Sequence, residues 1–119
     1  GIGIDKSPAD ARRTPKVQIT ENIIKFGPVK HNAPQQQRTF TLTNTGDGEL
    51  IVRAVETGGK VATTLTPGQR IPAGSSFAAK ATLDPGRQEY GVVTDFVTII
   101  TNDPTRPMRR LRATAIVED

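Results

Sequence analysis

The chain has 119 residues, no cysteine, no tryptophan and a formal net charge of +4. This length suits one domain with its own core, and the lack of cysteine excludes disulfides and thiolate metal sites. Aromatic residues are only 4% of the sequence, which argues against a stacking platform for single-stranded nucleic acid. There is also no run of about 18 apolar residues, so we expect no membrane insertion.

The first 16 residues combine charged side chains with Pro8 and Pro15 and show no sustained periodicity. We expect them to form an N-terminal arm or interdomain linker, with the folded domain in residues 17–119. The start lacks the apolar stretch of a signal peptide, so we expect any export signal to lie upstream.

From residue 17 onward the apolar residues alternate with polar ones. Val17 and Ile19 share one face, and the apolar run after them is closed by Gly27-Pro28, where we expect the first strand to break and continue. In RTFTLTN, Phe40 and Leu42 point to one side and the threonines to the other. A period of two over β-branched residues indicates β-strands.

The second half repeats this pattern. ELIVRAVE puts Leu50, Val52 and Ala54 on one face, and GGKVATTLTPG indicates a short strand. Three longer alternating segments come next, over residues 77–83, 92–100 and 111–117, and the turn signals TGDG, TPG, PAG, DPG and NDP punctuate the sequence. Such spacing predicts an all-β fold, an immunoglobulin-like β-sandwich of seven to eight strands of antiparallel type.

The stretch NTGDGEL, residues 44–50, has the composition of a calcium loop or of a turn. An EF-hand loop needs about twelve residues with alternating ligands and a late bidentate carboxylate. After Asp47 and Glu49 the next carboxylate is Glu56, which is out of reach. We therefore predict no metal site and no cofactor.

We interpret NTGDGEL instead as a hairpin between two strands. Asn44 would cap the turn with its side chain, and Gly46 and Gly48 would supply positive φ angles.

Two further polar features receive structural interpretations. TNDPTRP, residues 101–107, should end the longest strand and aim the last one, with Asp103 held extended by the following proline. His31 is the only histidine, and we expect it to be a solvated loop residue. Neither has a partner that would make it catalytic, so we predict no catalytic residue.

The string RPMRRLR places Arg110 and Arg112 on one face of an extended strand. One interpretation is a positive stripe, joined by Arg12 and Arg13 if the arm folds back, that binds an anionic partner. The other is a charged outer face that discourages edge-to-edge association, and this one is favoured. Nucleic-acid binding is disfavoured, because no aromatic or groove-reading element is visible.

Phe96 and Ile100 lie on the face of the longest strand opposite Val93, Val97 and Ile99. If the latter three are core, Phe96 and Ile100 point outward. An outward apolar pair could contact another domain or protomer, or be covered by a loop or by the arm. Both alternatives stay open.

Several motifs recur in an order that resembles a known family. They are FGPV (26–29), TLTNTGDGELIV (41–52), IPAG (71–74), LDP (83–85) and TNDPTRP (101–107). Over about residues 17–117 the chain resembles a bacterial immunoglobulin-like family catalogued as a domain of unknown function. That family is similar to ASH and hydin domains, the major sperm protein fold and PapD-type chaperone domains.

The chain departs from this family at one point. Members often carry Cys-Gly-Cys where this chain has Glu56 to Gly59, so no cysteine-based role applies here. The resemblance implies an extracytoplasmic domain (periplasmic, cell-surface or secreted), often one of several in tandem, with no established enzymatic activity.

Together these observations predict a non-enzymatic structural or interaction module of a larger exported bacterial protein. Its partner would be another domain of the same chain or another protein, bound through strand faces or an edge. The candidate surface consists of Phe96, Ile100, Arg110 and Arg112. The alternative is an accessory domain that binds an anionic polymer or glycan through the arginine stripe. The oligomeric state is left open.

Overall fold

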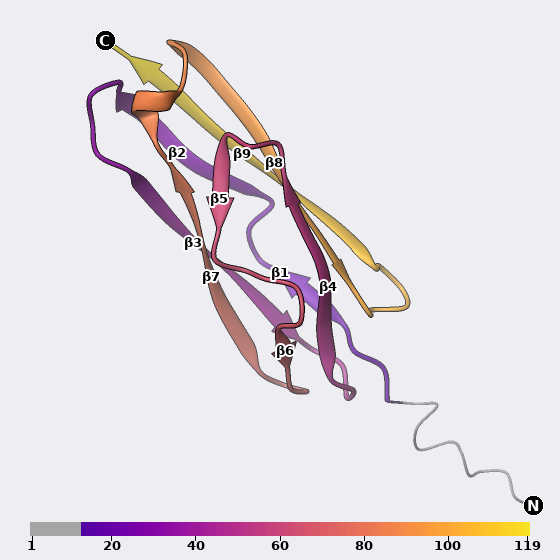
Figure 1. Ribbon diagram of the computed structural model, residues 1–119. Coiled ribbons are helices and arrows are strands. Elements are labelled where there is room, and N and C mark those ends of the chain that lie inside the picture. The colour runs from indigo at the N-terminus through magenta and orange to yellow at the C-terminus, as the bar shows by residue number, and fades with distance from the viewer. Residues whose placement is uncertain (1–12) are drawn as a thin grey trace, which may run out of the picture.

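The computed structural model describes residues 13–119, and these form two packed β-sheets (Figure 1). The strands are β1 (Val17–Ile19), β2 (Ile23–Lys30), β3 (Gln36–Asn44), β4 (Leu50–Thr57), β5 (Val61–Thr63), β6 (Arg70–Ile71), β7 (Ser76–Leu83), β8 (Gly91–Thr101) and β9 (Met108–Glu118), with a short 3₁₀ helix, η1 (Pro85–Arg87), before β8. Within this range no helix has the length and hydrophobicity to cross a membrane.

One sheet has the strand order β1-β3-β7-β5 and the other β2-β9-β8-β4-β6. The predicted immunoglobulin-like sandwich is therefore confirmed. One pairing departs from the antiparallel type, because β2 runs parallel to β9. The cause is a change of sheet: the first extended segment pairs with β3 as β1, crosses at residues 20–22, and pairs with β9 as β2.

The alternation of the sequence builds the core between the sheets. Phe40 and Leu42 of β3 and Val97 and Ile99 of β8 are all fully enclosed. The predicted inward faces of β3, β7, β8 and β9 are confirmed in this way, and the opposite positions point to solvent. Each enclosed side chain of this size contributes about 1.5–3 kcal/mol of hydrophobic stabilisation.

Strand β4 departs from its predicted alternation. We expected Ala54 to face inward with Leu50 and Val52, but a bulge interrupts the register between Val52 and Ala54. A bulge adds one residue to one strand and reverses the facing of the residues after it. As a result Val55, not Ala54, packs against the core.

The connection NTGDGEL also differs from its prediction as a hairpin. It joins β3 and β4, which belong to different sheets, so it is a crossover between the layers. Asn44 does cap it, since its Oδ1 accepts from the Gly46 backbone at 3.0 Å. The expected positive φ angles of Gly46 and Gly48 are wrong, because within residues 13–119 the glycines with positive φ are Gly27, Gly59, Gly68, Gly74 and Gly91.

Gly46 and Gly48 are needed for a different reason, which is the close approach of residues 13–16. A Cβ on Gly46 would overlap the Thr14 carbonyl, and one on Gly48 would lie 2.7 Å from the Arg13 carbonyl oxygen. This segment is held by further bonds, since Thr14 N donates to Asp47 Oδ1 at 2.9 Å. The last part of the predicted arm is thus docked on the domain, and residues 1–12 of that prediction lie outside the described residues.

Candidate interaction surface

The four predicted surface residues meet on the outer face of the five-stranded sheet. Strands β8 and β9 are neighbours there, and their register sets Phe96 opposite Arg112 and Ile100 opposite Met108. Arg110 lies opposite Thr98, between these two pairs. The geometry therefore brings Phe96, Ile100, Arg110 and Arg112 together, whereas a role for them in binding stays a prediction.

The same face carries apolar side chains that the sequence analysis did not single out. Val92 is 78% exposed, Met108 54%, Ile116 47% and Ile23 40%, beside Phe96 at 39%. Their signal in the sequence was available, because Met108 and Ile116 alternate with the inward positions of β9. Ile100 itself is half-buried. We call this surface the outer face: Ile23 and Lys25 of β2, Val92, Phe96 and Ile100 of β8, and Met108, Arg110, Arg112 and Ile116 of β9.

The cations of the outer face have no carboxylate partner within residues 13–119. In that range the ion pairs are Arg70–Glu49, at 2.7 Å, and Arg87–Asp84, at 3.6 Å. Neither includes a cation of the outer face. The Arg110 guanidinium lies 5.4 Å from the centre of the Phe96 ring, a cation–π distance. This contact holds one charge over an exposed aromatic ring.

A shallow hollow of about 280 Å³ adjoins this pair on the side of β4. Phe96 and Arg110 are among its lining residues, and so is Glu56 of β4. The outer face is thus not flat, and a partner side chain has room to insert beside the Phe96 ring.

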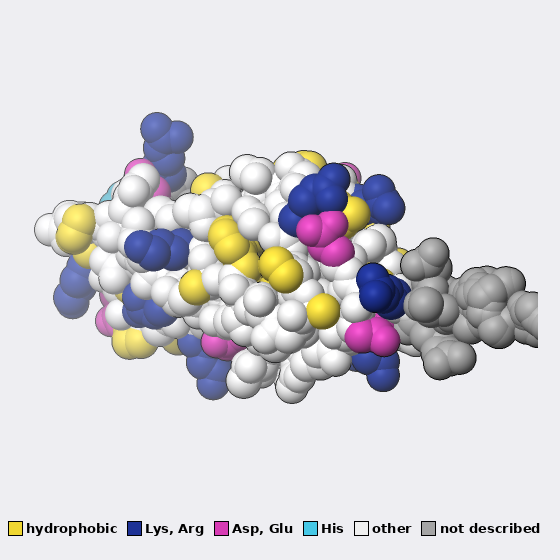
Figure 2. Space-filling view, turned by 90° about the horizontal axis from the view of Figure 1, so that it is seen from below, with side chains coloured by type: hydrophobic (Ala, Val, Ile, Leu, Met, Phe, Trp, Pro, Cys, Tyr) yellow, Lys and Arg dark blue, Asp and Glu magenta, His cyan; other side chains and the backbone are white. Residues whose placement is uncertain are grey.

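The predicted contribution of the arm to the arginine stripe does not follow from the structure. Arg12 lies outside the described residues, and the Arg13 carbonyl packs beside Gly48 at the β3–β4 crossover. Figure 2 shows the molecule from below, and on that side basic side chains are spread out, several with acidic neighbours, while hydrophobic ones lie in small groups. The net charge of +4 is therefore not gathered on the side shown there.

The long edge of β2 is protected against strand addition. Its register shifts between Lys25 and Gly27, and the next residue is Pro28, which has no N–H to donate. Arg38 of β3 reaches across from the other sheet and donates to the carbonyls of Lys25 at 3.0 Å and Phe26 at 3.2 Å. Bulges, proline and charge are the usual means by which proteins blunt an edge.

Asp95 is a buried carboxylate that the sequence analysis missed. It lies on the inward face of β8, 5% exposed. Its Oδ1 accepts from Gly58 N at 2.8 Å, and its Oδ2 accepts from Lys60 N and Val61 N at 2.9 and 3.0 Å. It therefore fixes the crossover from β4 to β5. The signal in the sequence was a charged residue at an inward position of an alternating strand.

Asp103 is the second buried carboxylate. Its Oδ2 accepts from Val17 N at 2.9 Å, and its Oδ1 accepts from Thr105 N at 2.8 Å. Burial by itself would raise the pKa of Asp103, but the hydrogen bonds from Val17, Thr105 and Arg106 outweigh it and lower the pKa. The motif ends β8 and leads into β9, which confirms the structural interpretation of TNDPTRP.

His31 is half-buried, which corrects its prediction as a solvated residue. Its ring stacks on Tyr90 with centroids 4.7 Å apart, and Nε2 lies 3.0 Å from the Gln88 carbonyl oxygen. An apolar ring surface was available next to the loop, because the β7–β8 connection folds back beside it.

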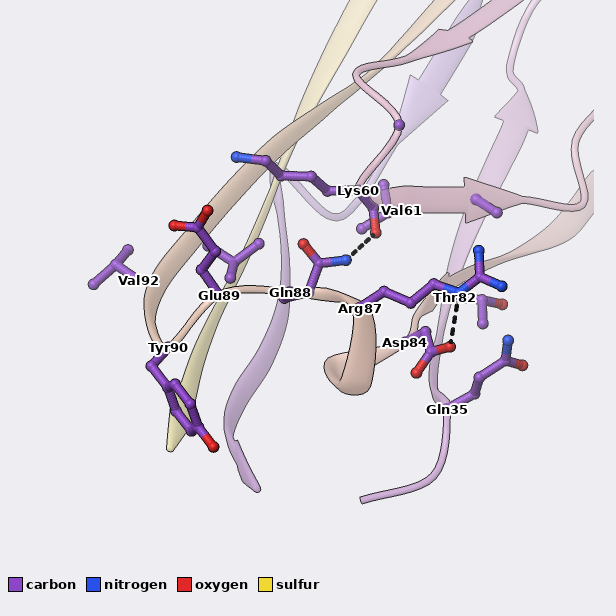
Figure 3. A pocket seen from close by; sticks show the side chains of 13 residues that line it. Gln35, Lys60, Val61, Thr82, Asp84, Arg87, Gln88, Glu89, Tyr90 and Val92 are labelled. Atoms are coloured by element: carbon purple, nitrogen blue, oxygen red, sulfur yellow. Dashed lines mark hydrogen bonds and ion pairs between the residues drawn. The ribbon is translucent and has the colours of Figure 1, made fainter. Parts of the chain in front are cut away.

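A second, larger hollow of about 790 Å³ lies at this end of the sandwich. In Figure 3 its labelled side chains spread around the space and do not converge, and the bonds drawn are Gln88 to the Lys60 carbonyl and Arg87 to Asp84. Across residues 13–119 no three His, Asp or Glu side chains gather as metal ligands would. The hollow thus lacks the few convergent polar groups typical of a small-molecule site.

A family model matches residues 17–117, that of the family described as "Protein of unknown function (DUF1573)". The chain belongs to this family. The match begins at β1 and ends within β9, so it covers the sandwich. No curated protein matches the chain.

Solved structures share the fold of this DUF1573 domain. A protein of unknown function from Porphyromonas gingivalis is 21% identical with a TM-score of 0.78, and the match covers 89% of this chain and 48% of that one. The ASH/PapD-like domain 7 of human CEP192 is 12% identical with a TM-score of 0.68, covering 90% and 88%. The periplasmic chaperone SfaE is 9% identical with a TM-score of 0.62, covering 87% and 59%.

These likenesses establish the fold of the DUF1573 domain as that of ASH and PapD-like domains. The chain spans about half the length of the Porphyromonas gingivalis protein. The likenesses assign no site, so the case for the outer face rests on the geometry of this chain.

Proposed function

We propose that this domain is a non-enzymatic interaction module of a larger, exported bacterial protein, and that it docks a protein partner through the outer face. One observation carries the proposal: Phe96 stands exposed beside Arg110 and Arg112, and neither arginine has a carboxylate partner within residues 13–119. An exposed aromatic ring with flanking arginines is the composition that protein interfaces favour.

The structure supports a face in preference to an edge. The edge of β2 is blunted by a bulge, by Pro28 and by Arg38. The edge of β4 is interrupted by its own bulge after Val52 and is paired with β6 at its start. At the edges of the five-stranded sheet a partner strand would therefore find few regular stretches of free backbone, whereas the outer face presents side chains across three strands.

The buried carboxylates support a non-enzymatic role. Asp95 and Asp103 are occupied by backbone N–H groups, so both hold the chain's own connections between strands. Among the similar structures is a periplasmic chaperone, which agrees with a protein-binding role outside the cytoplasm.

The domain division that we propose is an arm or linker over residues 1–16 and a sandwich over 17–119. The family match over residues 17–117 supports it. The docked residues 13–16 belong physically with the sandwich.

A photo-crosslinking residue on the outer face tests the proposal in the bacterium that makes the protein. Thr94 is exposed on β8 between Val92 and Phe96, and Thr39 is exposed on β3 of the opposite sheet, so the two form a matched pair. We expect defined protein adducts from position 94 and few from position 39. Equal yields, or none from position 94, would remove the outer face as the docking surface.

The alternative function is an accessory domain for an anionic polymer or glycan. It is favoured by Lys25, Arg110 and Arg112, which lie on adjacent strands and form no ion pair within residues 13–119. Retention on heparin at low salt that disappears in Arg110→Ala/Arg112→Ala would support it, since polyanion binding depends on neutralised charges. No retention at low salt would end it.

A further inference from the structure

We infer that the partner surface of the outer face is a protein surface that is both acidic and apolar, with carboxylates placed beside aliphatic or aromatic side chains. This inference rests on the proposed function and names the chemistry of its partner. It follows from how charge and apolar surface are interleaved on β2, β9 and β8.

Cross-strand neighbours arrange the outer face in rows. At one end Pro28, Ile116 and Val92 form an apolar row. At the other end Met108 pairs with Ile100. The distance between these ends is eight residues of β8, or about 27 Å at 3.4 Å per residue.

The rows between these ends carry the charge. In one row Lys25 lies opposite Thr114. In the next row Arg112 lies between Ile23 on β2 and Phe96 on β8. Each cation therefore has an apolar side chain in its own or the adjacent row. Desolvating a cation without a partner charge is costly, so a purely apolar partner would be rejected.

A purely anionic partner fits only half of the surface. A polyanion would pair with Lys25, Arg110 and Arg112 but would leave Phe96, Val92 and Ile116 in water, although these side chains are 39%, 78% and 47% exposed. Burying apolar surface is worth about 25 cal/mol per Å². A partner with both carboxylates and apolar side chains gains both the charge pairing and the burial of apolar surface.

A second copy of the same face is disfavoured by charge. The central rows carry three cations, Lys25, Arg110 and Arg112, and the carboxylate nearest them across the sheet is Glu56, in the row of Arg110 and Thr98. Two such faces would oppose like charges, which costs affinity and prevents wrong pairings. The occupant is therefore a different surface with acidic groups.

The area predicts modest affinity. Three strands spaced about 4.8 Å apart and about 27 Å long give a face of roughly 400 Å². That is below the roughly 800 Å² that each partner of a standard interface buries. Loss of either the charge pairing or the apolar contacts should therefore reduce the affinity measurably.

Three peptides added to the isotope-labelled 119-residue chain test the chemistry by NMR chemical-shift mapping. One alternates Glu with Leu, one Lys with Leu, and one Glu with Ser, and all have twelve residues. We expect the Glu–Leu peptide to shift the amides of residues 92–100 and 108–116 and to bind at least fivefold more tightly than the other two. We expect Arg110→Gln/Arg112→Gln to weaken it about tenfold, and Lys80→Gln, an exposed change on β7 of the other sheet, to leave it unchanged.

Equal or tighter binding of the Lys–Leu peptide would overturn the acidic half of the inference, and equal binding of the Glu–Ser peptide would overturn the apolar half. No shift on the outer face with any peptide at about 1 mM would overturn both. None of these results bears on cross-linking from Thr94, so the proposed function would stand or fall separately.

Discussion

The crossover between β3 and β4 and the outer face of β8 and β9 use polar residues in opposite ways. At the crossover, Asn44 Oδ1 accepts from Gly46 N and Lys16 N, and its Nδ2 donates to the carbonyls of Gly48 and Ile71. On the outer face, Arg110 and Arg112 form no ion pair within residues 13–119. Polar groups with internal partners hold the chain's path, and those without one are available to another molecule.

This contrast separates two kinds of substitution. Changes at the buried polar residues should lower the free energy of unfolding and affect binding only through it. Changes on the outer face should leave the free energy of unfolding almost unchanged and affect binding directly. Substitutions at the buried polar residues and on the outer face can establish whether the first change stability and the second change binding.

The largest effect is expected from Asp95→Ala. The change leaves the N–H group of Val61, which is buried, and those of Gly58 and Lys60, which are partly buried, without their acceptor, and a fully buried unsatisfied group costs about 1–3 kcal/mol. We expect urea unfolding to show a loss of about 3 kcal/mol. Thr94→Ala, next to it but exposed, is the matched control, with a change below about 0.5 kcal/mol. A loss under about 1 kcal/mol at Asp95 would show that the β4–β5 crossover does not depend on it.

The next effect is expected from Gly46→Val, because its side chain would occupy the place of the Thr14 carbonyl. Overpacking of this kind costs about 1–3 kcal/mol, and here it should release residues 13–16. Amide exchange at Thr14 and Lys16 should become fast, and trypsin should cleave readily after Arg13. The matched control is Ala78→Val, at an exposed strand position. Gly68→Val would not serve, because the positive φ of Gly68 (+95°) makes any side chain there strained. Unchanged exchange at Thr14 would contradict the docking.

A smaller effect is expected from protonation of Asp103. Its pKa is lowered in the folded state from the ordinary value of 3.8, so its stabilisation is fully present above that value and is lost as the pH falls through the lower folded-state pKa. We expect Asp103→Asn to cost on the order of 1–2 kcal/mol near neutral pH and to flatten the fall in stability below pH about 4. An equally steep acid dependence in the variant would show that other carboxylates control it.

The smallest effect on stability is expected from Arg110→Gln/Arg112→Gln. Both side chains are exposed, and surface changes away from special features usually stay within about 0.5 kcal/mol. Thermal unfolding of the double variant should therefore match that of the unchanged chain. A clear loss of stability would mean that the arginines serve the fold and not a partner.

Much of the fold could be predicted from the alternation of the sequence. Positions such as Phe40, Leu42 and Val97 alternate strictly and are enclosed as expected. The assignment of strands to sheets could not be predicted, because a turn composition such as NTGDGEL suits a hairpin and a crossover equally. The bulge after Val52 was equally hidden, since ELIVRAVE is apolar on both faces.

The candidate surface was predictable in part for the same reason. Phe96, Ile100, Arg110 and Arg112 follow from which positions of β8 and β9 face outward. The contribution of Ile23 and Lys25 could not be foreseen, because it depends on the parallel pairing of β2 with β9. That the arginines find no carboxylate partner within residues 13–119 likewise depends on contacts between distant segments.

The contrast between the β3–β4 crossover and the outer face can be tested by measuring both partner binding and thermal stability in one variant. Cross-linking from position 94 is measured in the bacterium that makes the protein, for the unchanged chain and for Arg110→Gln/Arg112→Gln, and the melting temperatures of both purified chains are compared. We predict that adduct yield falls at least fivefold while the melting temperature stays within about 2 °C. An unchanged adduct yield, or a yield that falls only together with the melting temperature, would contradict this contrast.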